Sequence, residues 1–379
     1  MALDYTKLIL KNGRIFDPGE GTDRVGDLYI RDNRIVPEAF PPDDETRVID
    51  VGGHLVLPGL IDFHTHLNFG GSDVGLLPDL MLLPNGVTTA VDAGSCGVSN
   101  YESFSKYTIA SSLTTLKSLL YIANTGQTTE AFAENLDPVH FDEARICRMF
   151  ERYRGELLGI KIRLGKKFAP DISALLRAVK IADKAGCFLS VHMIDLPCPY
   201  EEALLHLRAG DLLVHPYHFR GVTIFDEAGR VRPCLIEAKK RGVLIDLACA
   251  RYNHGLENLC RAVGQGFWPD FVTTDLGRNS IYERPVFALP YVMSVLLAAG
   301  MPLDAVVRGC TSTPAQKIGL AGQRGTLKPG AYADVAVMKP LEGERVFIDK
   351  LGYECKGNLL FSPRMTVKDG RILYQSIEI

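Results

Sequence analysis

The stretch "LPGLIDFHTHLNFGG", residues 57–71, decides how the rest of the chain is interpreted. It is an apolar run that ends in two histidines, His64 and His66, separated by a single residue. Side chains at positions i and i+2 of a strand point to the same face, so both imidazoles lie on the face that carries Asp62. Convergent imidazoles at a strand end suit a metal ion, whereas two unrelated core or surface histidines would leave the same pattern. Only the remainder of the sequence separates these two interpretations.

The bulk composition is that of a globular protein. Of 379 residues, 46% are hydrophobic and 23% are charged, and the length allows one large domain plus a small one. The net charge of −3, without a long run of one sign, argues against nucleic acid or a membrane surface as the main partner. We find neither a signal-type N-terminal segment nor the roughly 20 apolar residues of a membrane helix. Nine cysteines without CxxC spacing indicate free thiols, so we expect a cytoplasmic protein.

Both ends of the chain are β-like, and the middle has a different pattern. Residues 1–56 and 326–379 alternate apolar and polar positions between turn signals, so we expect them to build one small β-sandwich domain. Residues 57–325 repeat short apolar strands with helical segments between most of them, which predicts an α/β fold of the (β/α)8 TIM-barrel type. An open doubly wound sheet is the competitor, but no GxGxxG motif follows the first strand. The eight strands are "GLIDFH", "VTTAVD", "SLLYIA", "LLGIKI", "CFLSVH", "DLLVH", "VLIDLA" and "DFVTTD".

The ends of these strands carry a set of residues that chance does not explain. In a barrel of this type the working side chains lie at the C-terminal ends of the strands. Each of these side chains alone has an ordinary structural explanation, but together they fit a single ring of ligands. Apart from the histidine pair on strand 1, the ring contains Lys161 on strand 4, His192 on strand 5, His215 on strand 6 and Asp275 on strand 8.

This pattern resembles the amidohydrolase superfamily of metal-dependent barrels, and the resemblance covers nearly the whole chain. It rests on "PGLIDFHTHL", "GVTTAVDAG", "GIKIRLG", "VHM", "LVHPYHFRG", "TTDL" and the tail "STPAQKIGLAGQRGTLKPGAYADVAV". Within the superfamily the chain is most similar to the dihydroorotase-like group, which includes N-acyl and O-acetyl deacetylases. In such enzymes the strand-4 lysine is carbamylated and bridges two divalent metals. The resemblance thus implies two metal ions, with zinc as our first choice, held by His64, His66, Lys161, His192, His215 and Asp275.

Elementary chemistry agrees with that role for Lys161. A free ammonium has three donors and no lone pair, so it cannot bind a cation. Carbamylation would turn it into a bridge with two oxygens, whereas an ordinary lysine would send its ammonium to solvent. In the mechanism that the resemblance implies, a metal-bridging hydroxide attacks the substrate carbonyl. Asp275 would be the catalytic acid-base group, or a plain metal ligand, or both.

Several further residues are candidates for binding the substrate. Arg163 follows Lys161 by two positions on the same strand face and could hold a carboxylate, or form a structural ion pair. Arg251 and Arg278 lie after strands 7 and 8 and are candidates by position alone. His218 could polarise a carbonyl or be an exposed loop histidine. Cys96 ends strand 2, where we expect a buried and inert thiol.

One segment departs from the resemblance. The deacetylases of this group often carry a glycine- and histidine-rich stretch after strand 7, and this chain has "DLACARYNHG" there. Because that loop usually shapes the leaving-group pocket, the substrate of those enzymes cannot simply be transferred.

The resulting hypothesis is a hydrolase of an amide or ester bond in a small, carboxylate-bearing molecule, of the N-acyl amino acid or O-acetyl hydroxy acid deacetylase type. The alternatives are a cyclic amide hydrolase of the dihydroorotase or hydantoinase type, then a deaminase, and lastly a non-catalytic barrel with a binding or structural role. We expect a small molecule as the partner, no nucleic acid, no membrane, and a homo-oligomer.

Overall fold

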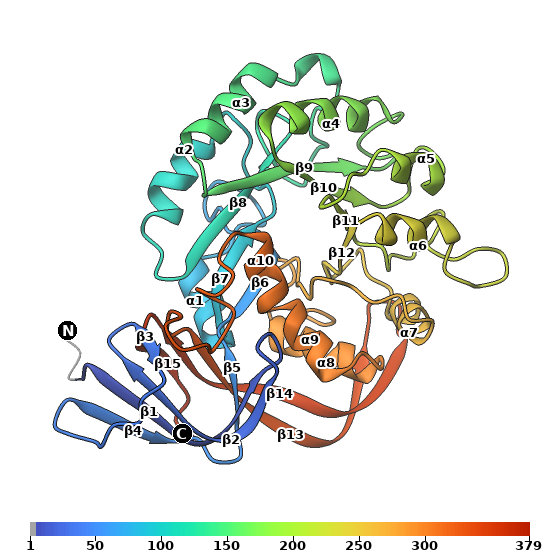
Figure 1. Cartoon of the computed structure of the whole chain (residues 1–379). Coiled ribbons are helices and arrows are strands. Elements are labelled where there is room, and N and C mark those ends of the chain that lie inside the picture. Colours follow the sequence, from blue (N-terminus) through green and yellow to red (C-terminus); the bar gives the residue numbers. More distant parts are fainter. Residues whose placement is uncertain (1–4) are drawn as a thin grey trace.

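The computed structural model describes residues 5–379, and its larger part is a curled parallel sheet wrapped by helices (Figure 1). Seven strands follow one another in sequence order across this sheet, each hydrogen-bonded to the next. They are β6 (Leu60–Thr65), β7 (Val87–Asp92), β8 (Thr115–Tyr121), β9 (Leu157–Leu164), β10 (Phe188–Met193), β11 (Leu212–Val214) and β12 (Leu244–Asp246).

The eighth predicted strand, "DFVTTD" at residues 270–275, closes this sheet into a barrel. At its start Phe271 forms a parallel bridge with Asp246 at the end of β12. Directly after its end Leu276 forms a parallel bridge with Thr65 at the end of β6. Between them the amides of Cys249 and Ala250 donate to the carbonyl oxygens of Thr273 and Thr274, so the segment is hydrogen-bonded along its length although it forms no regular ladder. The α/β barrel predicted from the sequence is confirmed.

Apolar side chains explain why these segments become strands of a barrel. Every residue of β6 and of β7 is buried, as expected for a parallel sheet that is covered on both faces. Inside the barrel the rings of Phe63 and Phe271 lie 4.8 Å apart, between centroids, and fill its centre. Apolar side chains thus fill the interior of the barrel. The polar side chains lie at its rim, where the strands end.

Helices cover the outside of the barrel (Figure 1). The longest, α4 (Ser173–Ala185), buries one apolar face and ends at Gly186, whose φ of +66° suits glycine, as the sequence predicted. The others are α1 (Pro78–Leu82), α2 (Tyr101–Phe104), α3 (Glu143–Arg152), α5 (Tyr200–Leu205), α6 (Pro233–Lys240), α7 (Leu256–Gly264), α8 (Leu289–Ala298), α9 (Leu303–Gly309) and α10 (Ser312–Lys317), with the short turns η1 (Leu83–Asn85), η2 (Ser105–Ile109) and η3 (Pro138–His140).

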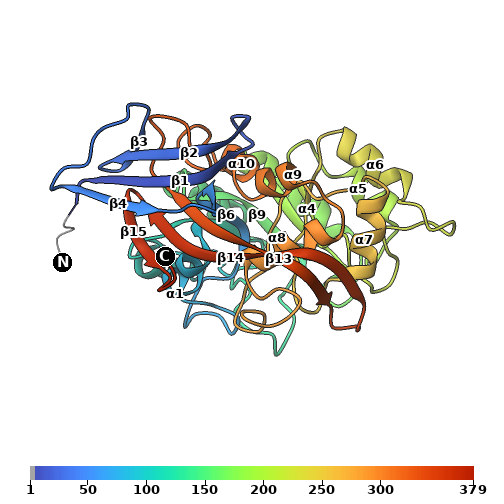
Figure 2. The same cartoon turned by 90° about the horizontal axis from the view of Figure 1, so that it is seen from below.

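Both termini build a second sheet beside the barrel, as predicted (Figures 1 and 2). Its hydrogen bonds run through eight strands without a break, so the expected sandwich is one continuous sheet around its own apolar core. The domain boundaries proposed from the sequence stay predictions. The strands are β1 (Lys7–Asp17), β2 (Thr22–Arg31), β3 (Arg34–Val36), β4 (Thr46–Asp50), β5 (Leu55–Pro58), β13 (Val335–Ile348), β14 (Glu354–Lys368) and β15 (Arg371–Gln375).

The long hairpin of β13 and β14 joins this sheet to the barrel (Figure 2). Strand β14 runs along α7 and α8, and the amide of Phe361 donates to the hydroxyl of Ser294 at 3.0 Å. At the hairpin tip the carboxylate of Asp349 accepts the amide of Leu256, the first residue of α7, at 2.8 Å. The terminal sheet therefore touches the segment that leads out of strand β12 and towards α7.

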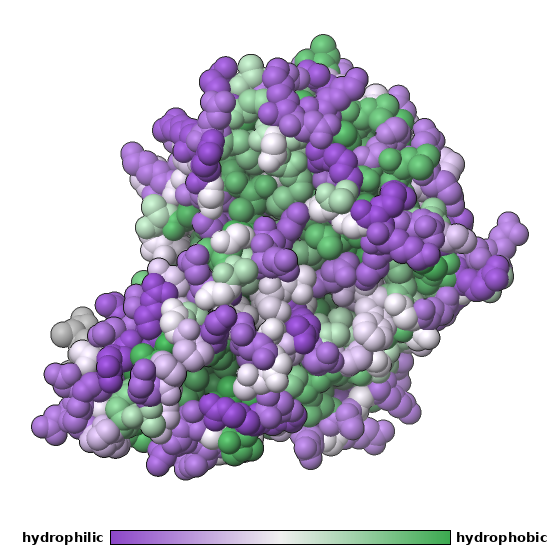
Figure 3. Space-filling model, viewed as in Figure 1, coloured by the Kyte–Doolittle hydropathy of each residue, from purple (hydrophilic) through white to green (hydrophobic). Residues whose placement is uncertain are grey.

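The outer surface carries no single broad apolar face in the view of Figure 3, where hydrophobic residues occur in several separate areas between hydrophilic ones. Among residues 5–379, no helix is both long enough and apolar enough to cross a membrane.

Candidate functional site

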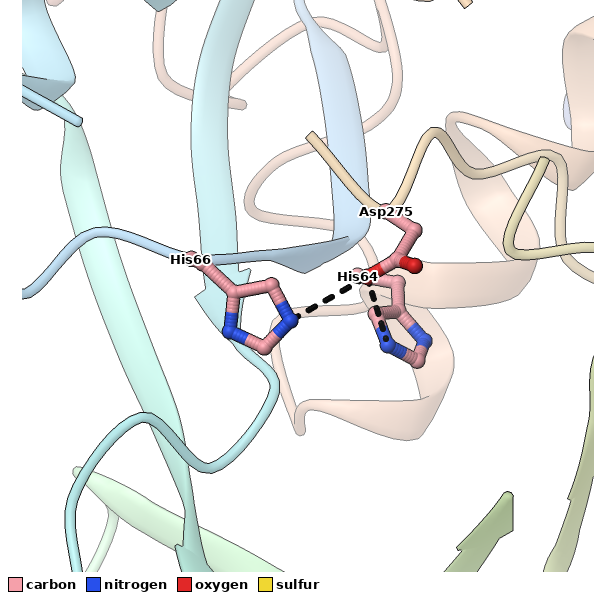
Figure 4. Close-up of side chains that lie close together, drawn as sticks. All are labelled: His64, His66 and Asp275. Carbon is pink, nitrogen blue, oxygen red and sulfur yellow. Dashed lines mark hydrogen bonds and ion pairs between the residues drawn. The ribbon is translucent and has the colours of Figure 1, made fainter. Parts of the chain in front are cut away.

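Three ligand-type side chains meet where β6 and the closing strand end (Figure 4). One ligand atom from each of His64, His66 and Asp275 lies within 4.8 Å of the other two. Oδ1 of Asp275 is 3.1 Å from Nε2 of His66 and 3.4 Å from Nε2 of His64. The two histidines of the quoted motif therefore do converge, whereas Asp62 lies outside the cluster and accepts the hydroxyl of Thr274 at 2.6 Å.

The remaining members of the predicted ring lie against this cluster. Nζ of Lys161, on β9, is 3.3 Å from Nε2 of His64. Nε2 of His215 is 3.8 Å from Oδ2 of Asp275. The ring of His192 has its centroid 4.6 Å from that of His215. All six residues that the sequence placed in one ring are thus brought together at one end of the barrel.

Hydrogen bonds beyond the ring fix which nitrogen of His64 and of His215 carries a proton. Nδ1 of His64 lies 2.6 Å from the carboxylate of Asp246, at the end of β12. Nδ1 of His215 lies 2.8 Å from the carbonyl oxygen of Ala248, which can only accept. Both imidazoles therefore donate through Nδ1 and keep the lone pair of Nε2 for the ring, which is the usual arrangement behind a metal-binding histidine.

The same argument holds for His66 through a hydroxyl. The hydroxyl of Ser95 donates to Asp92 at 2.7 Å, so its oxygen accepts from Nδ1 of His66, 3.0 Å away. Asp92 also accepts the amides of Ser95 and Leu67, which fixes the position of its carboxylate. With Nδ1 as the donor, Nε2 is the nitrogen that His66 can offer to a metal, and it lies 3.1 Å from the carboxylate of Asp275. An imidazole nitrogen and a carboxylate oxygen that converge in this way fit the donor set of a metal cation.

The buried histidines are held in the neutral form that metal binding needs. Burial lowers the pKa of His64, and it lowers the pKa of His192 well below its usual value. Burial also lowers the pKa of His215, to about 3, against the raising effect of the Asp275 charge. These rings therefore stay unprotonated in neutral solution and offer lone pairs.

Lys161 is unusual for a lysine because it is 1% exposed. Burial lowers the pKa of its amine to about 8, although the charges of Asp275 and Asp246 oppose that shift. A measurable fraction of the amine is then neutral, and so nucleophilic, near neutral pH. Gly94 makes room for this side chain, since a Cβ there would lie 2.7 Å from Cβ of Lys161.

Backbone strain is concentrated at the same place. Asp275 has a φ of +54° and His215 a φ of +59°, in the left-handed region that few residues other than glycine adopt. The amide of Asp275 donates to the carbonyl of His64 at 2.9 Å, which helps to hold the strained turn. Strain of this kind persists where the surrounding structure over-determines a functional geometry.

The ring lies in a cavity of about 460 Å³, large enough for a small molecule. The cavity walls come from the loops that follow the strands. All six residues of the ring line the cavity. The rest of the lining consists of Val74, Gln127, Glu130, Arg163, Lys167, Phe168, Ile194, Asp195, Arg220, Tyr252, Asn253 and Asn279.

Of the predicted substrate contacts, Arg163 lines the cavity. Its Nη2 is 2.5 Å from the buried carboxylate of Glu134, its Nη1 is 3.5 Å from Glu130, and its guanidinium lies 4.0 Å from the ring centroid of Phe168. The structural ion pair foreseen as the alternative is therefore present, and its partner is Glu134. The charge of Arg163 is already neutralised by that partner.

The other three candidates do not line the cavity. The guanidinium of Arg251 donates to the carbonyl oxygen of Asn279 at 3.1 Å and pairs with the carboxylate of Glu283 at 3.0 Å. Arg278 is exposed, and its guanidinium lies 5.9 Å from the ring of a neighbouring phenylalanine. Their roles as substrate contacts stay predictions without support from this arrangement.

His218 is fully buried rather than exposed on a loop. Its Nε2 lies 2.7 Å from the hydroxyl of Tyr200, and its Nδ1 accepts the amide of Arg220 at 3.2 Å. Both ring nitrogens are thus occupied inside the protein. Cys96 is buried as expected, burial raises the pKa of its thiol, and the amide of Asn68 donates to its sulfur at 3.1 Å.

Sequence reasoning missed three groups that matter here. Asp246 stands at the end of the strand "VLIDLA", where the strand-end rule could have found it. Arg220 lies inside the quoted segment "LVHPYHFRG", but no sequence pattern predicts that it lines the cavity. Tyr252 belongs to the unusual segment after strand 7, whose path depends on the hairpin of the terminal sheet.

Comparison with known proteins agrees with this geometry. The model of the amidohydrolase family matches residues 55–373. A deacetylase of Agrobacterium fabrum is 28% identical over 95% of this chain and 90% of that protein. A dihydroorotase of Syntrophus aciditrophicus is 25% identical over 97% of this chain and 99% of that protein. The crystal structure of a dihydroorotase superposes with a TM-score of 0.87 at 27% identity, covering 98% of both chains.

Proposed function

The chain belongs to the amidohydrolase family, and from that premise we propose that it removes an acyl group from a small carboxylate-bearing molecule. The expected substrates are N-acyl amino acids or O-acetyl hydroxy acids. The convergence of ligand atoms from His64, His66 and Asp275 at one end of the barrel is the observation that carries the proposal. Deacetylases among the similar proteins support the choice of an acyl group.

The chemistry of the donor set indicates where metal ions would bind. Imidazole nitrogens and carboxylate oxygens suit zinc, which is our proposal for the native metal. When bound, the two ions would lower the pKa of a coordinated water and polarise the substrate carbonyl. One ion would be held by His64, His66, Asp275 and a carbamylated Lys161, and the other by the same lysine together with His192 and His215.

Carbamylation of Lys161 is supported by its surroundings. The amine is buried, and among residues 5–379 no carboxylate lies within ion-pair distance of Nζ. An ammonium in that position would be a buried charge without a carboxylate at ion-pair distance, which is costly. Reaction of the neutral amine with carbon dioxide would replace the ammonium by an anionic group with two oxygens.

Asp275 is the group that would move the proton. Its Oδ1 faces His66 and His64, and its Oδ2 lies 3.8 Å from His215. We infer that the carboxylate takes a proton from the attacking water and returns it to the leaving oxygen or nitrogen. The strained backbone at Asp275 fixes the carboxylate for that task.

The test is a hydrolysis screen with the zinc-loaded protein. We expect turnover of N-acetyl amino acids or of acetyl esters of hydroxy acids, measured as released acetate. The similarity to the dihydroorotase structure makes ring opening of a cyclic amide the alternative reaction. Turnover of cyclic amides alone would replace the proposal by that reaction. Absence of turnover for all these substrates, at full metal occupancy, would contradict both.

A further inference from the structure

We propose that Arg220 is the residue that binds the carboxylate of the substrate, an inference that rests on the proposed function and names its specificity-determining cation. Arg220 lies in the connection between β11 and α6, five positions after His215, and its side chain lines the cavity. The sequence did not single it out. Its assignment follows from which positive charges of the cavity are free.

The charged side chains along the cavity wall differ in whether they already have a partner of opposite charge. Arg163 is paired with Glu134 and Glu130. The carboxylate of Asp195 is paired with Lys166, outside the lining, at 3.2 Å. Arg220, by contrast, has no carboxylate within 4.0 Å among the residues that the structure describes, 5–379.

The guanidinium of Arg220 is nevertheless held in place. Its Nη2 donates to the carbonyl oxygen of Tyr252 at 3.2 Å, which leaves its other N–H groups for a ligand. A planar guanidinium with free donors binds a carboxylate through two parallel hydrogen bonds. A substrate would thus place its carboxylate at the loops after strands β11 and β12, with its acyl group towards the histidine cluster.

Tyr252 connects this anchor to the terminal sheet. The ammonium of Lys350, at the tip of the β13–β14 hairpin, lies 3.9 Å from the centroid of the Tyr252 ring. The neighbouring Asp349 accepts the amide of Leu256 at 2.8 Å. Lys350 therefore acts as a positioning residue, because it fixes the loop whose carbonyl oxygen holds Arg220.

Lys167 is the competing cation. It lines the same cavity and has no carboxylate within 4.0 Å among residues 5–379. It lacks the hydrogen bond to a backbone carbonyl that orients Arg220, and a single ammonium does not match both carboxylate oxygens. The experiment below separates the two cations.

Binding should be measured by calorimetry with ligands that the enzyme cannot hydrolyse. N-methanesulfonyl derivatives of glycine, leucine and phenylalanine keep the carboxylate, and their primary carboxamides serve as neutral twins. With the zinc-loaded protein we expect Arg220→Ala to raise the Kd of the acids about 10- to 100-fold, the usual weight of charge-assisted hydrogen bonds. The Kd of the carboxamides should change less than threefold, and Arg220→Lys should recover part of the loss.

Three further variants complete the test. Arg230→Ala removes an exposed arginine from the same β11–α6 connection and should leave both ligand series unchanged. Lys350→Ala should raise the Kd of the acids by a smaller factor than Arg220→Ala and spare the carboxamides, while a merely structural role would affect both series. Lys167→Ala should have less effect than Arg220→Ala.

The outcome is decided independently of turnover. Equal affinity of wild type and Arg220→Ala for the acids, a loss confined to Lys167→Ala, or no preference of the wild type for acids over carboxamides would each overturn the proposal. A protein that shows the expected binding pattern but hydrolyses no acyl substrate would contradict the proposed function and leave Arg220 as a carboxylate anchor.

Discussion

Nδ1 of His64 and the carboxylate of Asp246 lie 2.6 Å apart, although 182 positions separate the two residues in the sequence. Both side chains are almost completely buried, and the hydroxyl of Thr273 donates to the second oxygen of Asp246. The contact joins strand β12 to strand β6 across the closing strand. This hydrogen bond also leaves Nε2 of His64 for the cluster. It therefore contributes to the candidate metal site as well as to the fold.

Replacing Asp246 should therefore weaken metal binding. In Asp246→Asn the amide can no longer act as a charged acceptor for Nδ1–H of His64, and the ring loses its fixed tautomer and some basicity. Outer hydrogen-bond partners of this kind contribute about 10- to 100-fold to metal affinity. We expect a loss in that range, measured by competition with a chelator of known affinity.

Asp270→Asn is the matched control for that experiment. Asp270 belongs to the neighbouring segment, but its carboxylate pairs with Lys239 at 3.0 Å and accepts the amide of Ile245 at 2.8 Å, and it does not contact the histidines of the ring. Its replacement should leave the metal affinity unchanged. Wild-type affinity in Asp246→Asn would show that the tautomer of His64 does not need this carboxylate.

Lys161→Ala should remove metal and activity together, because the alanine protein lacks the bridge between the two sets of ligands. A short-chain acid such as acetate or propionate should restore part of both, since its two oxygens fit the space of the missing carbamate. Metal content and turnover should be read in the same sample, with and without the acid. Full activity in Lys161→Ala would make the lysine an ordinary buried cation.

Metal stoichiometry is a separate prediction. Two groups of ligands that share one bridge should hold about two zinc ions per chain after loading. Elemental analysis gives the ratio directly, and removal by a chelator should abolish hydrolysis reversibly. A stable ratio near one, in a fully active enzyme, would contradict the binuclear arrangement.

The core of the barrel makes a prediction about stability. The rings of Phe63 and Phe271 fill the barrel centre, and both are almost inaccessible to solvent. Phe63→Ala should therefore lower the free energy of unfolding by about 3–5 kcal/mol, through lost apolar burial and a cavity. Phe132, 70% exposed, is the control, and Phe132→Ala should change stability little. The measurement is chemical denaturation followed by circular dichroism.

How much of this could be predicted from the sequence depends on the range of the interactions involved. Strand ends are local features, so the ring from His64 to Asp275 was accessible from the eight-unit pattern alone. The partner of Arg163 was not, because Glu134 comes from the connection between strands β8 and β9, whose path no local pattern fixes.

Which cations of the cavity lack a carboxylate partner could not be predicted from the sequence, for the same reason. Whether Arg220 or Arg251 faces the substrate depends on which acids the other loops supply, and Arg251 is taken by Glu283. The closing strand was predicted because its residues are apolar, whereas the left-handed backbone at Asp275, where it ends, has no signal in the sequence.

Asp275→Asn is the sharpest test of the mechanism. Asparagine tolerates the left-handed backbone that position 275 requires, so the substitution keeps the shape and one coordinating oxygen while it removes the basic site. General acid-base catalysis typically contributes 10²- to 10⁴-fold, so kcat should fall by roughly that factor.

The Kd of a non-hydrolysable acid should change little in Asp275→Asn, because the lost interaction belongs to the transition state. Metal content must be determined in the same preparation, since loss of a ligand would imitate loss of a base. Because Oδ1 of Asp275 is 3.1 Å from Nε2 of His66, the amide has to place its oxygen on that side to keep the metal. A variant that holds both ions and turns over at nearly the wild-type rate would show that another group moves the proton.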